Sequence, residues 1–395
     1  MRIPKTGNNQ YLKQMNQANV LDLIRTNKGI SRIELAKKTG LSPTAIGAIV
    51  RSLLRNDYIR EVGEGESTGG RRPTLLEIKE GSYYAFGFDI DVKFICTMVL
   101  DITGKVHYED KLEVREELTP EDAVRKIADI FSRVTAAKKL RKERILGVGI
   151  SVPGLMDLNT RRVMLAPNLG WADVDLLGKL KEHIDIPIFI ENEAMCSAIC
   201  ENWLGMCRGI EDFICINIES GIGAGIFMRG VLYRGHSGSA GEVGHIPVDE
   251  NGPKCKCGNR GCLETFASIN AMVTRYLKLS GKSKENSVDY DQCFENMLLQ
   301  VEKGDIRSLA ILKEAARYLG KAIGYLINAF NPEQIVLGKK FPLYAGLVLD
   351  DIRREARKSA LKYPAQNCSI LASLFGENSS ATGAAIIPIR KLFGY

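Results

Sequence analysis

The spacing of hydrophobic and polar residues changes near residue 80 of the 395-residue chain. Before that point, apolar residues recur at helical spacing in short segments, such as Leu21 and Ile24 ahead of a stop at Gly29. After it, apolar runs of strand length alternate with amphipathic helical segments, as in FICTMVLD and PEDAVRKIADIFSRV. The pattern predicts a small helical module followed by a larger α/β body.

Capping residues locate two further helices in the module. Ser31 precedes Glu34 by three residues in ISRIELAKKTG, which is a capping box, and Ser42 precedes Pro43 in SPTAIGAIVRSLLRND. Two short helices joined by a tight turn predict a helix-turn-helix unit. We expect four residues to form the apolar contact between these helices: Ala36, Ile46, Ile49 and Leu53.

A wing is predicted directly after the helix-turn-helix. YIREV and TLLEI indicate two strands around a Gly-rich tip with two arginines, which can reach phosphates or a narrow minor groove. The candidate DNA-binding residues of the module are Arg32, Ser42, Thr44, Arg51, Arg71 and Arg72. The alternative is a helical hairpin with a charged, solvated face.

Charge favours the DNA-binding interpretation. The chain has a net charge of +7, and its first 80 residues hold fourteen Lys and Arg against eight Asp and Glu. Most of the excess positive charge thus lies in the module, as expected for a nucleic-acid-binding module joined to a neutral body. No run of about 18 apolar residues occurs, and the ten cysteines are mostly single, so we expect a protein of the reducing cytoplasm with no membrane partner.

One loop of the body, GHIPVDENGPKCKCGNRGCLE, concentrates soft metal ligands. Four of its residues form a closed set that fits tetrahedral Zn²⁺ and leaves no position for a catalytic water: His245, Cys255, Cys257 and Cys262. We therefore expect a structural Zn²⁺. The alternatives are an unmetallated cluster of reduced thiols and a nucleic-acid-binding zinc knuckle, although the loop lacks interleaved basic and aromatic residues.

The metal loop, together with ESGIGAGI, IENEA and the wing sequence GGRRP, resembles the ROK family of repressors and sugar kinases over essentially the whole chain. The resemblance implies an α/β fold: an N-terminal winged helix-turn-helix followed by a two-lobed, actin-like ROK body of the sugar-kinase (ribonuclease H-like) type. The expected domains are residues 1–80 for DNA binding, 81–195 for a first lobe that a C-terminal helix at 380–395 closes, and 196–379 for a second lobe with the zinc loop.

The same resemblance implies a site for a monosaccharide effector. Its residues would be Asn168, Asn192, Glu193, Glu242, His245 and Glu264. Carboxylates and amides of this kind can satisfy several sugar hydroxyls at once. His245 would bind zinc through one ring nitrogen and a sugar hydroxyl through the other.

Three departures from the kinases of the family argue against catalysis. The glycines of the kinase phosphate hairpin are absent from DIDVK at 89–93, and two of the glycines near the adenine are replaced by lysine at 339–340. Glu193 stands where the kinases use Asp as general base, and its extra methylene moves the carboxylate by about 1 Å. The Gly-rich segment 221–225 survives, but it fits a tight strand turn equally well.

We therefore interpret the chain as a sugar-responsive, DNA-binding transcriptional regulator, a repressor of carbohydrate-utilisation genes that is no enzyme. Xylose or glucose is the first candidate effector. A homodimer or higher homo-oligomer is expected, because winged helices usually recognise two-fold repeats. Two alternatives stay open: an active ATP-dependent hexose kinase that also binds DNA, and a zinc-dependent interaction scaffold with no ligand.

Overall fold

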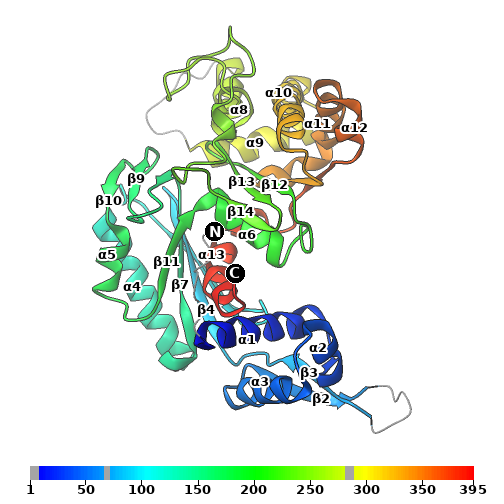
Figure 1. Ribbon diagram of the computed structural model, residues 1–395. Coiled ribbons are helices and arrows are strands. Elements are labelled where there is room, and N and C mark those ends of the chain that lie inside the picture. Colours follow the sequence, from blue (N-terminus) through cyan, green and yellow to red (C-terminus); the bar gives the residue numbers. More distant parts are fainter. Residues whose placement is uncertain (1–8, 66–71, 281–288) are drawn as a thin grey trace. The chain divides into compact units, whose positions relative to one another are not determined.

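The computed structural model describes residues 9–65, 72–280 and 289–395 and divides into two compact units (Figure 1). Unit 1 comprises Met1–Ile150, Leu176–Ile190 and Ala384–Tyr395, and unit 2 comprises Ser151–Asp175 and Glu191–Gly383. Within the described ranges, every helix is too short or too polar to cross a lipid bilayer. The expected division into three domains stays a prediction.

The N-terminal part of unit 1 folds as the predicted winged helix-turn-helix. Its elements are α1 (Asn9–Thr26), β1 (Ile30–Ser31), α2 (Arg32–Thr39), α3 (Pro43–Arg55), β2 (Ile59–Glu64) and β3 (Thr74–Ile78), with the strands in the order β1-β3-β2. Both predicted caps form: Ser31 and Glu34 make the capping box, and the Ser42 hydroxyl accepts a hydrogen bond from the Ala45 backbone at 3.2 Å. The wing tip lies outside the described residues.

The buried face of each of these two helices differs from the predicted one. Leu35 is fully buried whereas Ala36 is half-buried, and Val50 is fully buried whereas Ile49 is half-buried. Positions 46, 50 and 53 follow the spacing of a single helix face, so the second helix buries Val50 in place of Ile49. In the first helix, burying leucine in place of alanine removes more apolar surface from water.

The rest of unit 1 is a five-stranded sheet of order β11-β7-β4-β5-β6. Its strands are β4 (Tyr84–Ile90), β5 (Phe94–Asp101), β6 (Val106–Glu113), β7 (Ile145–Val152) and β11 (Ile188–Asn192), the first three forming the predicted antiparallel meander. The unit also holds α4 (Pro120–Ala137), α5 (Leu176–Lys181) and the C-terminal half of α13 (Ser379–Leu392) (Figure 1). A Cβ on Gly149 of β7 would lie 1.9 Å from the Ala384 oxygen, so glycine lets α13 pack directly on this strand.

Unit 2 is built on a second five-stranded sheet of order β14-β13-β12-β15-β16. Its strands are β12 (Phe213–Ile218), β13 (Ile222–Met228), β14 (Val231–Tyr233), β15 (Gln334–Lys339) and β16 (Ser369–Ala372). The first three form an antiparallel meander, and the last two continue the sheet in parallel. A small separate sheet holds β8 (Leu155–Met156), β9 (Val163–Ala166) and β10 (Trp171–Val174). A meander in each unit is the duplicated arrangement expected of an actin-like body.

Helices supply most of the core of unit 2. They are α6 (Glu193–Trp203), α7 (Glu264–Ala267), α8 (Ile269–Leu279), α9 (Tyr290–Glu302), α10 (Ile306–Phe330), α11 (Ala345–Ser359) and α12 (Lys362–Gln366). One apolar cluster joins β12, β13 and β15 to helices α7 to α11. Helix α6 lies so close to β13 that a Cβ on Gly225 would be 2.4 Å from the Cβ of Ala198. This glycine of the Gly-rich segment therefore serves helix packing.

Candidate functional site

A cavity of about 440 Å³ opens in unit 2 where several loops meet the start of one helix. Every residue that lines it belongs to unit 2. The lining includes all six residues expected to bind a monosaccharide: Asn168, Asn192, Glu193, Glu242, His245 and Glu264. The volume suits a small ligand, since small-molecule sites in proteins typically enclose about 300–1,000 Å³.

Asn192 fixes the start of α6 in the cavity wall. As the N-cap, its Oδ1 accepts hydrogen bonds from the backbone N–H groups of Ala194 and Met195, at 2.9 and 3.2 Å. Its Nδ2 donates to the Gly154 oxygen at 2.9 Å. Both ends of this amide are thus bonded to the protein, so Asn192 shapes the wall in which the next residue, Glu193, lies.

The Glu193 carboxylate is held by groups from two strands. Its Oε1 lies 3.2 Å from the Lys339 ammonium and accepts a hydrogen bond from Asn217 Nδ2 at 3.3 Å. The same ammonium lies 3.8 Å from Oε2 of Glu219, which also lines the cavity. Because the Lys339 side chain is only 2% exposed, a buried positive charge stands between two carboxylates of the wall.

The donor atoms of the predicted metal ligands, His245, Cys255, Cys257 and Cys262, all lie within 4.8 Å of one another. Cys257 Sγ is 3.7 Å from Cys262 Sγ, and His245 Nδ1 is 3.6 Å from Cys255 Sγ. Tetrahedral Zn²⁺ with bonds of about 2.3 Å to sulfur and about 2.0 Å to nitrogen requires ligand separations of about 3.5–3.8 Å. The four residues can therefore hold a metal ion of this geometry.

Glycine and two isolated bridges give the metal loop its shape. Pro247 bridges to Cys262, and Lys254 bridges to Arg260, in antiparallel fashion. The residue before Cys262 is a glycine with φ of 65°, and a Cβ there would lie 1.5 Å from the Asp249 oxygen. Only glycine fits this position, and it lets the chain turn so that Cys262 meets the other ligands.

His245 connects the metal ligands with the cavity. Its Nδ1 faces Cys255, and its Nε2 lies 3.9 Å from Oε2 of Glu242 in the cavity wall. This orientation is the one required if His245 binds a metal with one nitrogen and a ligand with the other. Burial raises the pKa of Glu242, and the nearby charge of Glu264 adds to that rise while His245 opposes it.

Glu264 lies against the metal cluster. Its Oε1 is 3.5 Å from His245 Nδ1 and accepts a hydrogen bond from Cys255 Sγ at 3.0 Å. Burial raises the pKa of the Cys255 thiol, and the hydrogen bond to Glu264 acts in the same direction. A metal cation would supply the positive charge that the cysteine thiolates and the carboxylate beside them lack.

The sequence did not single out four other polar residues at the cavity: Asn217, Glu219, Ser220 and Lys256. Glu219 and Ser220 begin the Gly-rich segment ESGIGAGI, so their place in a hairpin was an available signal. Asn168, at the exposed rim, donates from Nδ2 to Ser220 Oγ at 3.4 Å. The sequence showed that Lys339 replaces a glycine of the family kinases. It did not show that Lys339 contacts Glu193.

The winged helix presents a polar surface on α3. Four of the candidate DNA-binding residues are exposed: Ser42, Thr44, Arg51 and Arg72. The exposed residues of α3 at 44, 48, 51 and 55 share one helix face. Arg32 differs, because its Nη2 pairs with Oε1 of Glu61 at 2.7 Å and links α2 to β2. Arg71 lies outside the described residues.

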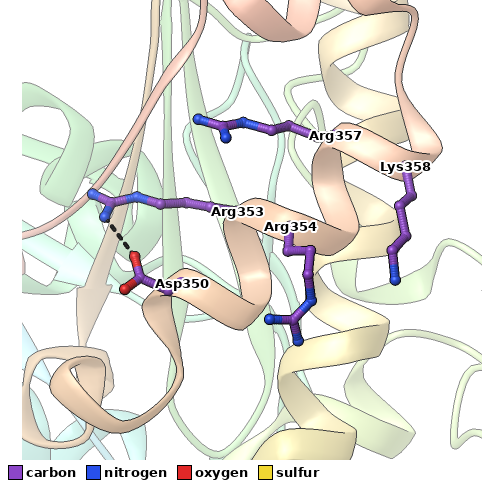
Figure 2. A pocket seen from close by; sticks show the side chains of 5 residues that line it. All are labelled: Asp350, Arg353, Arg354, Arg357 and Lys358. Atoms are coloured by element: carbon purple, nitrogen blue, oxygen red, sulfur yellow. Dashed lines mark hydrogen bonds and ion pairs between the residues drawn. The ribbon is translucent and has the colours of Figure 1, made fainter.

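A second hollow, of about 630 Å³, lies on α11 of unit 2. The residues that line it are Asp350, Arg353, Arg354, Arg357 and Lys358. Figure 2 shows that their side chains leave the helix in different directions. Arg353 is held by Asp350 at 3.0 Å, and Arg354 and Lys358 pair with other carboxylates of the same helix. Because the charges do not converge on one point, we assign no ligand to this hollow.

Both the winged helix-turn-helix and the α/β body are similar to parts of known proteins. The ROK family model matches residues 85–391, and a winged helix-turn-helix DNA-binding model matches residues 16–60. The xylose repressor of Bacillus spizizenii is 33% identical over 380 residues, which is 96% of each chain. A solved ROK family transcriptional regulator, described as a homologue of the E. coli MLC protein, aligns with a TM-score of 0.82 at 26% identity over 97% of each chain. A ROK family glucokinase from Streptomyces griseus, in complex with glucose and AMPPNP, aligns with a TM-score of 0.65 at 28% identity over 76% of this chain and 98% of that one.

Proposed function

Because the chain belongs to the ROK family, we propose that it is a sugar-responsive transcriptional repressor that binds operator DNA through its winged helix-turn-helix. One observation carries the proposal: a single chain combines an exposed polar face on α3 with a cavity walled by carboxylates and amides. The first suits a DNA major groove. The second suits a ligand with many hydroxyl donors, because each buried acceptor needs a partner.

The effector is an unphosphorylated aldose, with xylose and glucose as the first candidates. A relative that matches 96% of the chain is named a xylose repressor, and a related glucokinase structure contains glucose. Four carboxylates line the cavity: Glu193, Glu219, Glu242 and Glu264. Such a wall accepts hydrogen bonds from neutral hydroxyls and repels a phosphate group.

Zn²⁺ is the proposed metal of the His245, Cys255, Cys257 and Cys262 cluster, and its role is structural. A closed set of four protein ligands leaves no position for a reacting water. The ion would fix the loop that carries Glu264 and His245, two residues of the cavity wall. It would also compensate the negative charge of the cysteine ligands and of Glu264 beside them.

The proposed repressor does not phosphorylate its sugar. In the 89–93 hairpin, where family kinases offer backbone N–H groups to phosphate, the Lys93 N–H instead donates to Oδ1 of Asp91 at 2.9 Å. Glu193, at the position of the kinase base, is ion-paired with Lys339. An active hexose kinase that also binds DNA is the second candidate, because the glucokinase shares the body of the fold. Turnover of ATP with D-xylose or D-glucose by the purified protein would favour that candidate.

The test of the proposal is operator binding by the purified full-length chain, measured with and without each sugar of a monosaccharide panel. DNA selected from a random library supplies the operator, and sedimentation of the complex gives the number of chains bound. We expect a homodimer or higher homo-oligomer on a two-fold repeat. Selection of no DNA sequence, or an affinity that no sugar changes, would overturn the proposed function.

A further inference from the structure

Strand β15 ends in a buried cation at the cavity wall. Lys339, its last residue, is 2% exposed and has φ of 56°, in the left-handed region that favours glycine. Its Nζ lies 3.2 Å from Glu193 Oε1 and 3.8 Å from Glu219 Oε2. A buried ammonium is costly unless carboxylates pair with it. A strained backbone and a buried charge at one residue therefore indicate a role at this wall.

The ammonium acts on one side of the Glu193 carboxylate. Lys339 Nζ and Asn217 Nδ2 both contact Oε1 of Glu193, at 3.2 and 3.3 Å. In the part of the chain that the structure describes, Oε2 of Glu193 has no hydrogen-bond partner, although Glu193 lines the cavity. One oxygen is thus fixed by the protein, and the other is available to accept from a ligand hydroxyl.

We propose that Lys339 is the positioning residue of the sugar site, which keeps the carboxylates of Glu193 and Glu219 together as acceptors for ligand hydroxyls. The inference rests on the proposed function. Without the ammonium, two carboxylates would face each other in the wall and repel. The carboxylates would then turn away from each other, and this change removes an acceptor that a sugar hydroxyl needs. Lys339 acts through these two carboxylates rather than through its own contact with the sugar.

The neighbouring lysine provides a matched control. Lys340 is 7% exposed, and its Nζ pairs with Asp291 at 2.6 Å and with Glu377 at 3.4 Å. Neither of these carboxylates lines the cavity. Lys340→Met therefore removes a buried ammonium of the same kind, one residue away, and leaves the pairing of Glu193 unchanged.

The experiment is a calorimetric titration of the full-length protein with D-xylose and with D-glucose. Lys339→Met is expected to weaken sugar binding about 100-fold, because it displaces two charged acceptors and each contributes about tenfold. Lys339→Arg keeps a cation, so this variant is expected to bind sugar about tenfold more tightly than Lys339→Met and about tenfold more weakly than the parent protein. Lys340→Met is expected to bind within about threefold of the parent protein. The melting temperature and the operator affinity without sugar are recorded for each variant.

A double-mutant cycle separates positioning from a general effect on folding. In the Glu193→Gln background there is less charge to compensate, so adding Lys339→Met is expected to cost less than about tenfold. If Lys339→Met alone does not fold, the double variant is compared with Glu193→Gln alone, and a loss of about 100-fold between these two would overturn the inference. Equal losses in both backgrounds, or unchanged binding in Lys339→Met, would overturn the inference and leave the proposed function standing. A parent protein that binds neither sugar would overturn the proposed function, and the inference with it.

Discussion

The two sides of the cavity support their carboxylates in different ways. On one side, the metal-loop side, Glu264 lies at the end of the metal loop. The four donor atoms of this loop lie within 4.8 Å of one another and can share a metal ion. On the other side, which we call the α6 side because Glu193 begins helix α6, Glu193 and Glu219 face the ammonium of Lys339. Both arrangements place positive charge behind acidic groups that would otherwise repel. The first cation would be acquired from solution, whereas the second is encoded in the chain.

This difference predicts that the two sides respond to different treatments. A chelator should act on the metal-loop side alone, and a lysine substitution should act on the α6 side alone. Neither treatment touches the winged helix, which belongs to unit 1 while every cavity residue belongs to unit 2. The comparison therefore predicts sugar-binding defects that leave basal operator binding intact.

Loss of the metal should have the largest effect. Cys257→Ser, or treatment with a chelator, is expected to remove the metal and to lower sugar affinity by about 100-fold or more, because the loop that holds Glu264 loses its anchor. Elemental analysis measures the metal content, and calorimetry measures the sugar affinity. The control is Cys293→Ser, since Cys293 is half-buried in α9 and outside the cluster. A protein without metal that binds sugar normally would remove the metal loop from the account.

Glu264→Gln should have a smaller effect, because the amide keeps the shape of the side chain and removes its charge. We expect operator binding without sugar to be normal. The sugar concentration that gives half of the operator response should rise about tenfold, as expected for one charged acceptor lost from the cavity. Sugar titrations of an operator complex, read by fluorescence anisotropy, provide the measurement. If parent and variant give the same curve, the metal-loop side does not contribute to the response.

Arg72→Ala should change only the DNA side of the protein. Arg72 is exposed at the base of the wing, so we expect weaker binding to all DNA sequences and a salt slope that is smaller by about one. Sugar affinity should not change. Arg115→Ala is the control, since Arg115 is an exposed arginine of the unit 1 body. An unchanged salt slope in Arg72→Ala would contradict a phosphate contact at this position.

Glu193→Asp should produce no detectable kinase activity. The change restores the acid that family kinases use, but it leaves Asp91 bonded to the Lys93 N–H and leaves Lys339 in place. A coupled assay for ADP formation with D-glucose or D-xylose measures the outcome. Sugar phosphorylation by this single variant would show that the α6 side retains a kinase site and that Lys339 does not block it.

Local sequence signals were enough to predict the winged helix and the four residues that form the His and Cys cluster. Ser31 and Glu34 form their capping box within three residues, and the short-range pattern around Ser42 and Pro43 starts α3 as expected. The side chains of the four proposed metal ligands converge because they belong to one loop between residues 245 and 262. Caps and clustered His and Cys residues depend only on neighbours in the sequence, so short sequence patterns predict them.

The α6 side of the cavity could not be predicted in the same way. Strands β12 and β15 pair in parallel with Ile218 opposite Lys339, and this register brings the ammonium beside Glu219 and within reach of Glu193. The two strands are far apart in the sequence, so no local pattern predicts that Lys339 contacts these carboxylates. The buried face of α3 shows a milder form of the same limit, because tertiary packing selected Val50 over Ile49.

The central claim is that sugar bound in the unit 2 cavity controls operator binding by the winged helix. The most direct measurement is the operator affinity of the parent protein at fixed salt, with and without saturating D-xylose or D-glucose. The account predicts that one of these sugars lowers the affinity by about tenfold or more, within the usual range of coupling between two sites. An affinity that is the same with and without both sugars would contradict it.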